Sequence, residues 1–434
     1  MPKRAATVLR KLLLIYRQFR ACPTMLSLFS WILLGGSAYL FFSSMSIFFA
    51  DPAFRGFKGG DTKRDHGEHP LSFLNRFIAL LRVYVKVLRQ MLQVFLFKAY
   101  HVAYAVAFML LSAEGKSKPK KVAPLMDGAA EPQKVESKTM IFFRHGESQW
   151  NYCFNRGFFN LSFPFRLLSS LYYEFILGFH LDSVFVDAPL SELGIRQSCE
   201  VRDFLTKGGT PASPATGVDG WTPLALDETI VPILKGTGGP PSVLVASNLR
   251  RALSTTLISF GERLSRSNEK ILIHSALQEH TRNIDGISLA FPGDAPPTSL
   301  LESSLEALGV RNLYLTRLDA SLNHGNKPIR SRVTKRLQSF AEWVFAYRPS
   351  VNGEEGISGT SGGPEVVIVG GHSGWFRHFF RAYMPGDVDH VAKRKKIVNG
   401  GMVRFTLQKR IIGEGVDYHI DPASVAVIYG GFAK

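Results

Sequence analysis

Continuous apolar runs in the C-terminal two thirds of the chain predict buried strands, each followed by a helix. Residues 140–143, 242–247 and 365–370 contain such runs, and each gives way to polar residues or glycine before an amphipathic stretch. Strands that are apolar on both faces and alternate with helices are typical of parallel sheets covered on both sides. Residues 328–348 add one long amphipathic helix. The pattern therefore predicts an α/β fold, a three-layer sandwich with a mainly parallel sheet.

Two apolar regions precede this predicted domain. No charged residue lies between positions 21 and 50, and about 20 helical residues cross a bilayer core. We expect a retained transmembrane helix at about 25–50, with a cleaved signal peptide as the alternative because its apolar core is shorter. Residues 71–113 carry a polar stripe at helical spacing that ends near residue 98. This pattern predicts an amphipathic helix in a membrane interface, and a second membrane-crossing helix stays open.

The distribution of charge favours membrane lipids as a partner and no nucleic acid. The net charge is +17, and residues 1–121 hold 19 Lys and Arg against 5 Asp and Glu, so the rest of the chain is nearly neutral. Basic residues that flank apolar segments favour anionic lipid headgroups. The basic, acid-free N-terminus is also typical of mitochondrial targeting sequences. We expect a membrane-anchored protein, mitochondrial or endomembrane, with the side of the membrane left open.

Composition divides the chain into three expected parts. Residues 1–113 form a membrane-anchoring region. Residues 114–137, with several Lys, Ala, Gly and Pro, form a flexible linker. Residues 138–434 form the α/β domain.

Arginine and histidine residues follow the ends of the three predicted strands. Arg144 and His145 come after the first strand, Arg250 and Arg251 after the second, and His372 after the third. The start of a helix presents N–H groups and a positive dipole end, which attract an anion. Arginines placed there are better explained as anion ligands than as helix stabilisers, although a solvated pair is the alternative. An imidazole titrates near neutrality and can attack phosphorus, so the pattern predicts a phosphate site.

These motifs resemble those of the histidine phosphatase superfamily, in the branch named after cofactor-dependent phosphoglycerate mutase. The sequence Arg-His-Gly-Glu-Ser-Gln-Trp-Asn at residues 144–151 matches the signature of that branch. Further segments resemble its later motifs in the same order, at residues 187–197, 247–252, 277–279, 371–373 and 399–403. The resemblance covers about residues 138–434 and implies the phosphoglycerate-mutase-like form of the three-layer fold.

The resemblance implies a role for each matched residue. His145 would be the nucleophile that becomes a phosphohistidine, and Glu279 would protonate the leaving oxygen. The phosphoryl oxygens would be surrounded by Arg144, Arg251 and His372. Further polar contacts would come from Asn151, Ser148 and Ser373. The register of the second motif selects Arg251, and we expect Arg250 to face solvent or the protein surface.

No cofactor and no metal ion is expected. The histidines are far apart in the sequence and lack the His-x-x-x-His spacing of a metal site on one helix. The three cysteines are isolated from them.

The chain departs from the mutases around the substrate. An aromatic insertion at residues 161–186 replaces a short loop, and residues 280–286 lack the basic residues that hold a three-carbon phosphoacid in mutases. A mutase must retain the phosphoryl group, whereas a phosphatase only has to admit water. We therefore expect hydrolysis of a phosphomonoester, which is a small molecule, a phosphoprotein or a lipid phosphate. A phosphoglycerate-mutase-type phosphoryl transferase and a non-catalytic membrane scaffold with a phosphate-binding pocket are the alternatives.

The insertion itself admits two interpretations. Its aromatic and leucine residues predict a helical lid that packs on the domain. The alternative is a surface that touches the bilayer and admits an amphiphilic phosphate ester.

Overall fold

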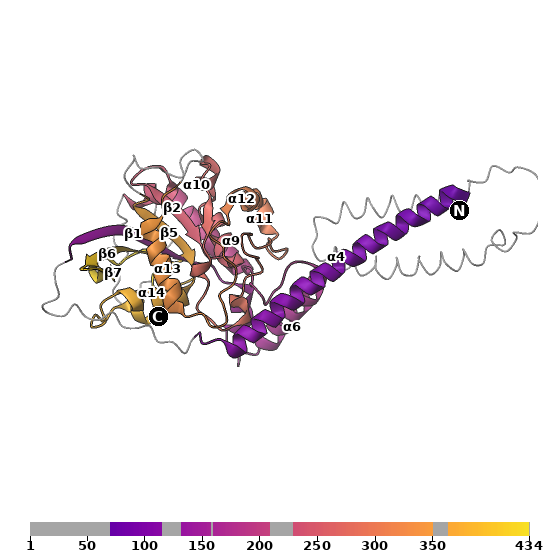
Figure 1. Ribbon diagram of the computed structural model, residues 1–434, viewed down its shortest axis with the longest axis horizontal. Helices are drawn as coiled ribbons and strands as arrows, with labels where there is room; N and C mark the ends of the chain where they lie inside the picture. Colours follow the sequence, from indigo (N-terminus) through magenta and orange to yellow (C-terminus); the bar gives the residue numbers. More distant parts are fainter. Residues whose placement is uncertain (1–69, 115–131, 158, 209–228, 350–362, 434) are drawn as a thin grey trace, which may run out of the picture. The chain divides into compact units, whose positions relative to one another are not determined.

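The computed structural model describes residues 70–114, 132–157, 159–208, 229–349 and 363–433 (Figure 1). The chain divides into two compact units. The smaller unit comprises the chain up to Tyr100 and the segment Tyr172–Leu181, and the larger unit comprises His101–Leu171 and Asp182–Lys434. The transmembrane helix expected at 25–50 and most of the expected linker lie outside the described residues.

The larger unit is built on one sheet, in which eight strands lie within the described residues. The strand order is β4-β3-β2-β5-β1-β6-β7, and β8 also pairs with β6 (Figure 1). The strands are β1 (Lys134–Arg144), β2 (Ser242–Ala246), β3 (Ile271–Ile273), β4 (Leu318–Asp319), β5 (Val366–Gly371), β6 (Met402–Ile412), β7 (Gly415–Ile420) and β8 (Ala426–Tyr429).

The sheet is mixed, so the prediction of a mainly parallel sheet is wrong. The pairs β1–β5, β5–β2, β2–β3 and β3–β4 are parallel. The pairs β1–β6, β6–β7 and β6–β8 are antiparallel. Only Gly413 and Glu414 connect β6 to β7, and Gly413 has a φ of +58°. A connection this short makes a hairpin and cannot make the crossover that a parallel pair requires.

Helices cover both faces of the sheet. Alternation along β1 places Met140 and Phe142 on one face and Ile141 and Phe143 on the other. The first face packs against α13 (Val333–Ala346) and α14 (Ser373–Tyr383). The second face packs against α7 (Glu192–Thr206), α9 (Arg250–Ser259) and α12 (Val310–Thr316). The three expected layers are therefore present, and α13 lies within the helix predicted at 328–348.

Shorter elements complete the larger unit. The α-helices are α5 (Gln149–Phe154), α8 (Ile230–Lys235), α10 (Gly261–Arg266), α11 (Ser304–Ala307) and α15 (Val391–Arg394). The 3-10 turns of the chain are η1 (Leu177–Phe179), η2 (Ser275–Leu277), η3 (Ile284–Gly286) and η4 (Pro422–Ser424).

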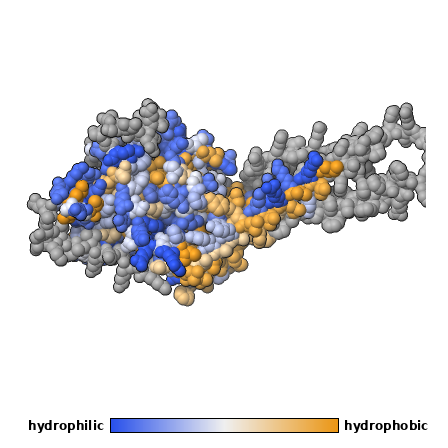
Figure 2. Space-filling model, in the orientation of Figure 1, coloured by the Kyte–Doolittle hydropathy of each residue, from blue (hydrophilic) through white to orange (hydrophobic). Residues whose placement is uncertain are grey.

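Two helices, α4 (Pro70–Leu111) and α6 (Phe163–Ile176), carry exposed apolar side chains. Within the described residues, α4 is long and apolar enough over Tyr84–Leu111 to span a membrane. The polar residues Arg166 and Ser170 of α6 are buried. Most of its large apolar residues are exposed, and these include Phe165, Leu168, Leu171, Tyr172 and Phe175. Figure 2 shows apolar side chains gathered over the region of α6 and along α4. This polarity is the reverse of a helix that packs its apolar face on a domain.

Two glycines let the loop after β1 lie directly against the start of α7. A Cβ on Gly146 would lie 2.4 Å from the carbonyl oxygen of Gly194, and a Cβ on Gly194 would lie 2.0 Å from the carbonyl oxygen of Glu147. The contact is fastened by Ser191, whose N–H donates to the Glu147 carbonyl at 2.9 Å and whose hydroxyl donates to its carboxylate at 2.7 Å. Any side chain at these two glycines would push the loop away from the helix.

We expect Gly194→Ala to lower the free energy of unfolding by about 2 kcal/mol, because the new methyl group overlaps backbone atoms that cannot move aside cheaply. Gly261→Ala is the matched control, since its Cβ would meet Leu313 at an ordinary 3.8 Å. The control should stay within about 1 kcal/mol of wild type. Denaturant unfolding measures both, and equal stabilities for the two variants would contradict the close packing.

Candidate active site

A polar cavity opens where the parallel strands end. Its volume is about 210 Å³. Of the eight predicted site residues, six line it, namely Arg144, His145, Asn151, Arg251, Glu279 and Ser373. The ring of His372 is completely buried behind them, with its centroid 5.0 Å from that of His145. Ser148 does not line the cavity but caps α5, accepting from the N–H of Asn151 at 3.2 Å.

The hydrogen bonds of His145 define its tautomer. Its Nδ1 lies 2.6 Å from the carbonyl oxygen of Gly146, which can only accept, so Nδ1 carries the hydrogen. The remaining nitrogen, Nε2, accepts from the Nε of Arg251 at 3.3 Å. His145 therefore presents an unprotonated Nε2, which is the form that can attack phosphorus.

Burial, followed by the positive charges of Arg251 and Arg144, holds the pKa of His145 well below its ordinary value. The imidazole is therefore neutral at pH 7. Burial also lowers the pKa of Arg144 to about 10, against the opposing effect of Glu279, so this guanidinium stays charged. The last residue of β1, next to the imidazole, thus supplies a half-buried cation, which donates to the carbonyl of Ile397 at 2.6 Å.

The carboxylate of Glu279 is fixed at the start of α14. Its Oε1 accepts from the N–H of Trp375 at 3.1 Å and from the N–H of His280 at 2.8 Å. A Cβ on Gly374 would lie 2.6 Å from the same oxygen. Gly374 therefore leaves the space that the carboxylate occupies, which explains why glycine follows Ser373 at the first turn of this helix.

His372 has one bonded and one free ring nitrogen. Its Nε2 lies 2.9 Å from the hydroxyl of Ser247. Its Nδ1 is buried and has no hydrogen-bond partner among the residues that the structure describes. Burial, and then Arg251 and His145, hold the pKa of His372 well below its ordinary value. A neutral imidazole with one unused nitrogen is available to an added ligand.

One nitrogen or oxygen atom from each of His145, Glu279 and His372 lies within 4.8 Å of the others. Two imidazoles and a carboxylate at this spacing could hold a metal ion. A divalent cation would, however, lie beside the guanidinium of Arg251, whose Nε is 3.3 Å from the Nε2 of His145. A phosphate dianion gains from that charge instead, so the electrostatics of the cavity favour an oxyanion.

Arg250 is buried, and the prediction that it faces solvent or the surface is wrong. Its side chain has no exposed area and pairs with Asp182. Its Nε donates to the Asp187 carbonyl at 2.8 Å. Although burial opposes the charge, the carboxylates of Asp182 and Asp187 raise the pKa of Arg250. Arg251, which the motif register selects, lines the cavity. Arg250 instead holds the loop before α7 and is not exposed to solvent.

Several residues that line the cavity were not predicted from the sequence. Asp285 pairs with Arg251, with 3.4 Å between Oδ2 and the guanidinium NH2. The others are Trp150, Asn155, His280, Thr281, Asn283, Arg377 and Lys396. Trp150 lies in the signature at residues 144–151 but was given no role there, and the others belong to no recognised motif. Their positions depend on how the loops fold back over the strand ends.

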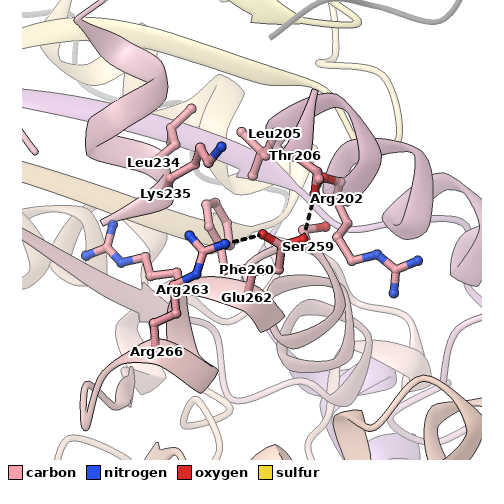
Figure 3. A pocket seen from close by; sticks show the side chains of 10 residues that line it. All are labelled: Arg202, Leu205, Thr206, Leu234, Lys235, Ser259, Phe260, Glu262, Arg263 and Arg266. Atoms are coloured by element: carbon pink, nitrogen blue, oxygen red, sulfur yellow. Dashed lines mark hydrogen bonds and ion pairs between the residues drawn. The ribbon is translucent and has the colours of Figure 1, made fainter. Parts of the chain in front are cut away.

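A second hollow, between α7, α8, α9 and α10, lacks the chemistry of a binding site. Its volume is about 10 Å³, which is room for about one water molecule. Figure 3 shows Glu262 beside it, held by Thr206 at 2.8 Å and by Arg266 at 2.9 Å. Arg263 is engaged by Glu269 at 2.6 Å. These basic side chains already have carboxylate partners, so the larger cavity is the candidate site.

Comparisons with known proteins give structural likenesses only. No protein-family model matches the chain, and no curated protein matches it. A mycobacterial glucosyl-3-phosphoglycerate phosphatase solved with VO3 is 17% identical with a TM-score of 0.29, over 66% of this chain and 98% of that chain. Phosphoserine phosphatase from Entamoeba histolytica, solved with 3-phosphoglyceric acid, is 14% identical with a TM-score of 0.26, over 66% and 96%. The function therefore has to be inferred from the residues of the cavity.

We expect Asp285→Asn to strengthen the binding of inorganic phosphate at pH 7.5 but not at pH 5. Burial raises the pKa of Asp285 to about 6, against the opposing effect of Arg251. Below that pH the native carboxyl is neutral like the amide, whereas above it the charge repels phosphate. The ratio of wild-type to variant Kd should be near 1 at pH 5 and roughly 10 at pH 7.5.

Calorimetric titration at the two pH values measures these ratios, and taking a ratio cancels the titration of phosphate itself. The exposed Asp294→Asn serves as the control variant. A pH-independent ratio for Asp285→Asn would show that this carboxylate does not oppose the anion.

Proposed function

We propose that this protein is a membrane-anchored phosphatase that hydrolyses a phosphomonoester through a phosphohistidine on His145. The supporting observation is the convergence of His145, Glu279 and His372 within 4.8 Å on a cavity that Arg144 and Arg251 also line. The resemblance of residues 144–151 to the histidine phosphatase signature agrees with this assignment.

In the first step, the Nε2 lone pair of His145 attacks phosphorus and the bond from phosphorus to the ester oxygen breaks. The protonated carboxyl of Glu279 gives its proton to that oxygen, so the alcohol leaves neutral. Negative charge builds up on the phosphoryl oxygens during this step. We expect it to be stabilised by Arg144, by Arg251 and by the Nδ1 of His372. Buried, pre-positioned cations stabilise such a transition state because they need no reorganisation.

In the second step, water attacks the phosphorus of the phosphohistidine and the phosphorus–nitrogen bond breaks. The carboxylate of Glu279, having lost its proton, accepts one from the water. The products are inorganic phosphate and a neutral His145, and the carboxyl is again protonated. The cycle needs no metal ion and no cofactor. Its leaving group stays open among small-molecule, protein and lipid phosphates.

We expect His145→Ala to lower phosphate release from p-nitrophenyl phosphate by about 10³-fold or more, because the nucleophile is removed. The assay uses the full chain in detergent. His419→Ala on β7, away from the cavity, is the control and should keep wild-type turnover. Rapid quenching with a radiolabelled substrate should trap a phosphoryl group on wild type that survives base and is lost in acid.

Equal turnover of wild type and His145→Ala would remove the catalytic proposal. That outcome would favour the alternative of a membrane scaffold that binds phosphate without hydrolysing it.

We also propose that α6 lies against the bilayer. Its exposed side chains are apolar while Arg166 and Ser170 are turned inward. Arg166 donates to the carbonyl of Gly157 at 2.9 Å, which accounts for its burial. An apolar outer face is stable against lipid tails but not against water. The basic residues of the N-terminal region would add attraction to anionic headgroups.

A polarity-sensitive fluorophore on Leu168→Cys should shift to the blue when the full chain is reconstituted into anionic vesicles, because the label enters the bilayer. The same label on Leu315→Cys is the control, since Leu315 is a comparably exposed leucine, 75% against 64%, on α12. The signal of labelled wild-type chain is subtracted to remove the native cysteines. Equal spectra at the two positions would contradict membrane contact by α6.

A further inference from the structure

The C-terminal end of α4 belongs to the same compact unit as the cavity. His101, Ala105 and Phe108 are buried, and the larger unit begins at His101. The hydroxyl of Tyr104 donates to the carbonyl of Lys327 at 2.8 Å. The guanidinium of Arg282 donates to the carbonyls of Met109 and Leu110 at 2.6 and 3.1 Å, which satisfies the end of the helix. Residues 101–114 are therefore part of the folded unit.

A buried carboxylate follows this helix. Glu114 is 1% exposed. Its oxygens pair with the ammonium of Lys327 at 2.6 Å, with the guanidinium of Arg336, and with the Nδ1 of His280 at 3.3 Å. Burial alone would raise the pKa of Glu114, but Lys327, His280 and Arg336 together lower it to about 2. Glu114 is thus an ionised anion that neutralises two buried cations.

The two cations hold the backbone on either side of Glu279. The ammonium of Lys327 donates to the carbonyl of Glu279 at 2.6 Å and to the carbonyl of Thr281 at 2.7 Å. The guanidinium of Arg336 donates to the carbonyl of Gln278. Three carbonyls of one loop therefore depend on two cations that share one carboxylate. Neither cation has a second carboxylate within 4 Å in the part of the chain that the structure describes.

We propose that Glu114 is a positioning residue, which acts through Lys327 and Arg336 to hold the loop of Glu279 where its carboxyl meets the substrate. The proposal rests on the phosphatase function proposed above. Removing one partner of a buried ion cluster leaves the other charges uncompensated, which is more disruptive than replacing the cluster. Without Glu114, Lys327 and Arg336 repel each other, and the loop that they hold loses its fixed position.

Two esters with different leaving groups can distinguish a misplaced Glu279 carboxyl from a general loss of protein stability. The phenol of phenyl phosphate leaves only if its oxygen is protonated, whereas 2,4-dinitrophenyl phosphate releases 2,4-dinitrophenolate, which is a stable anion. In the full chain, Glu114→Gln should lower kcat/KM, which reports the first step only, by about 100-fold for phenyl phosphate and by less than about 3-fold for 2,4-dinitrophenyl phosphate. Glu114→Asp, which keeps the charge, should recover part of the loss. Glu269→Gln, which breaks the Arg263–Glu269 pair away from the cavity, should affect both esters equally.

The double variant Glu114→Gln with Lys327→Met guards against misfolding, because it removes one anion and one cation together. It should fold and still discriminate between the esters, since the carbonyls of Glu279 and Thr281 lose their donor. Hydrogen exchange of peptides spanning residues 276–286 should be faster than in wild type for both variants, and this measurement does not depend on turnover.

Three other outcomes would contradict the positioning role of Glu114 or the phosphatase function. A loss of kcat/KM by the same factor for both esters would overturn the positioning role, even with faster exchange. If wild type hydrolyses neither ester, the phosphatase proposal fails on its own. Unchanged exchange at residues 276–286 would then overturn the attachment of this loop to Glu114 as well.

Discussion

The contact between the guanidinium of Arg251 and the Nε2 of His145 is the interaction on which the candidate site depends. Burial of the imidazole, and then this neighbouring cation, hold the pKa of His145 well below its ordinary value, so the ring is neutral. The same cation needs a negative partner, which Asp285 supplies within the protein. The cavity is also lined by Arg144, Arg377 and Lys396, so its cationic side chains outnumber its two carboxylates, and an arriving oxyanion is the natural complement.

The topology of the sheet explains why these charged side chains lie close together. Strands β1, β2, β3 and β5 are parallel neighbours, so their carboxyl ends meet at one edge. His145, Arg251, Glu279 and His372 each follow one of these strands, which makes the meeting of residues far apart in the sequence a property of topology. The antiparallel strands β6 to β8 contribute none of these four residues. They extend the sheet on the other side of β1 and complete the core.

This division also explains what the sequence could predict. The motif residues are readable because a strand end followed by Arg or His is a local pattern, and parallel strands bring such ends together. Mixed pairing was missed because no chemical motif lies on the hairpin at Gly413. The burial of Arg250 was mispredicted, and the role of Glu114 was not predicted, for a different reason. Each is placed by an ion pair with a distant residue, such as Arg336, 222 positions from Glu114, and no local pattern reports a partner at that separation.

The inverted polarity of α6 bears on how the protein behaves outside a lipid environment. Six large apolar side chains along this helix would face water in a detergent-free preparation. Such faces cover one another when no other apolar phase is present, so chains would self-associate through α6. If α6 lies against a bilayer as proposed, a stoichiometry measured in plain buffer would reflect this self-association, and it should change when lipid or detergent is added.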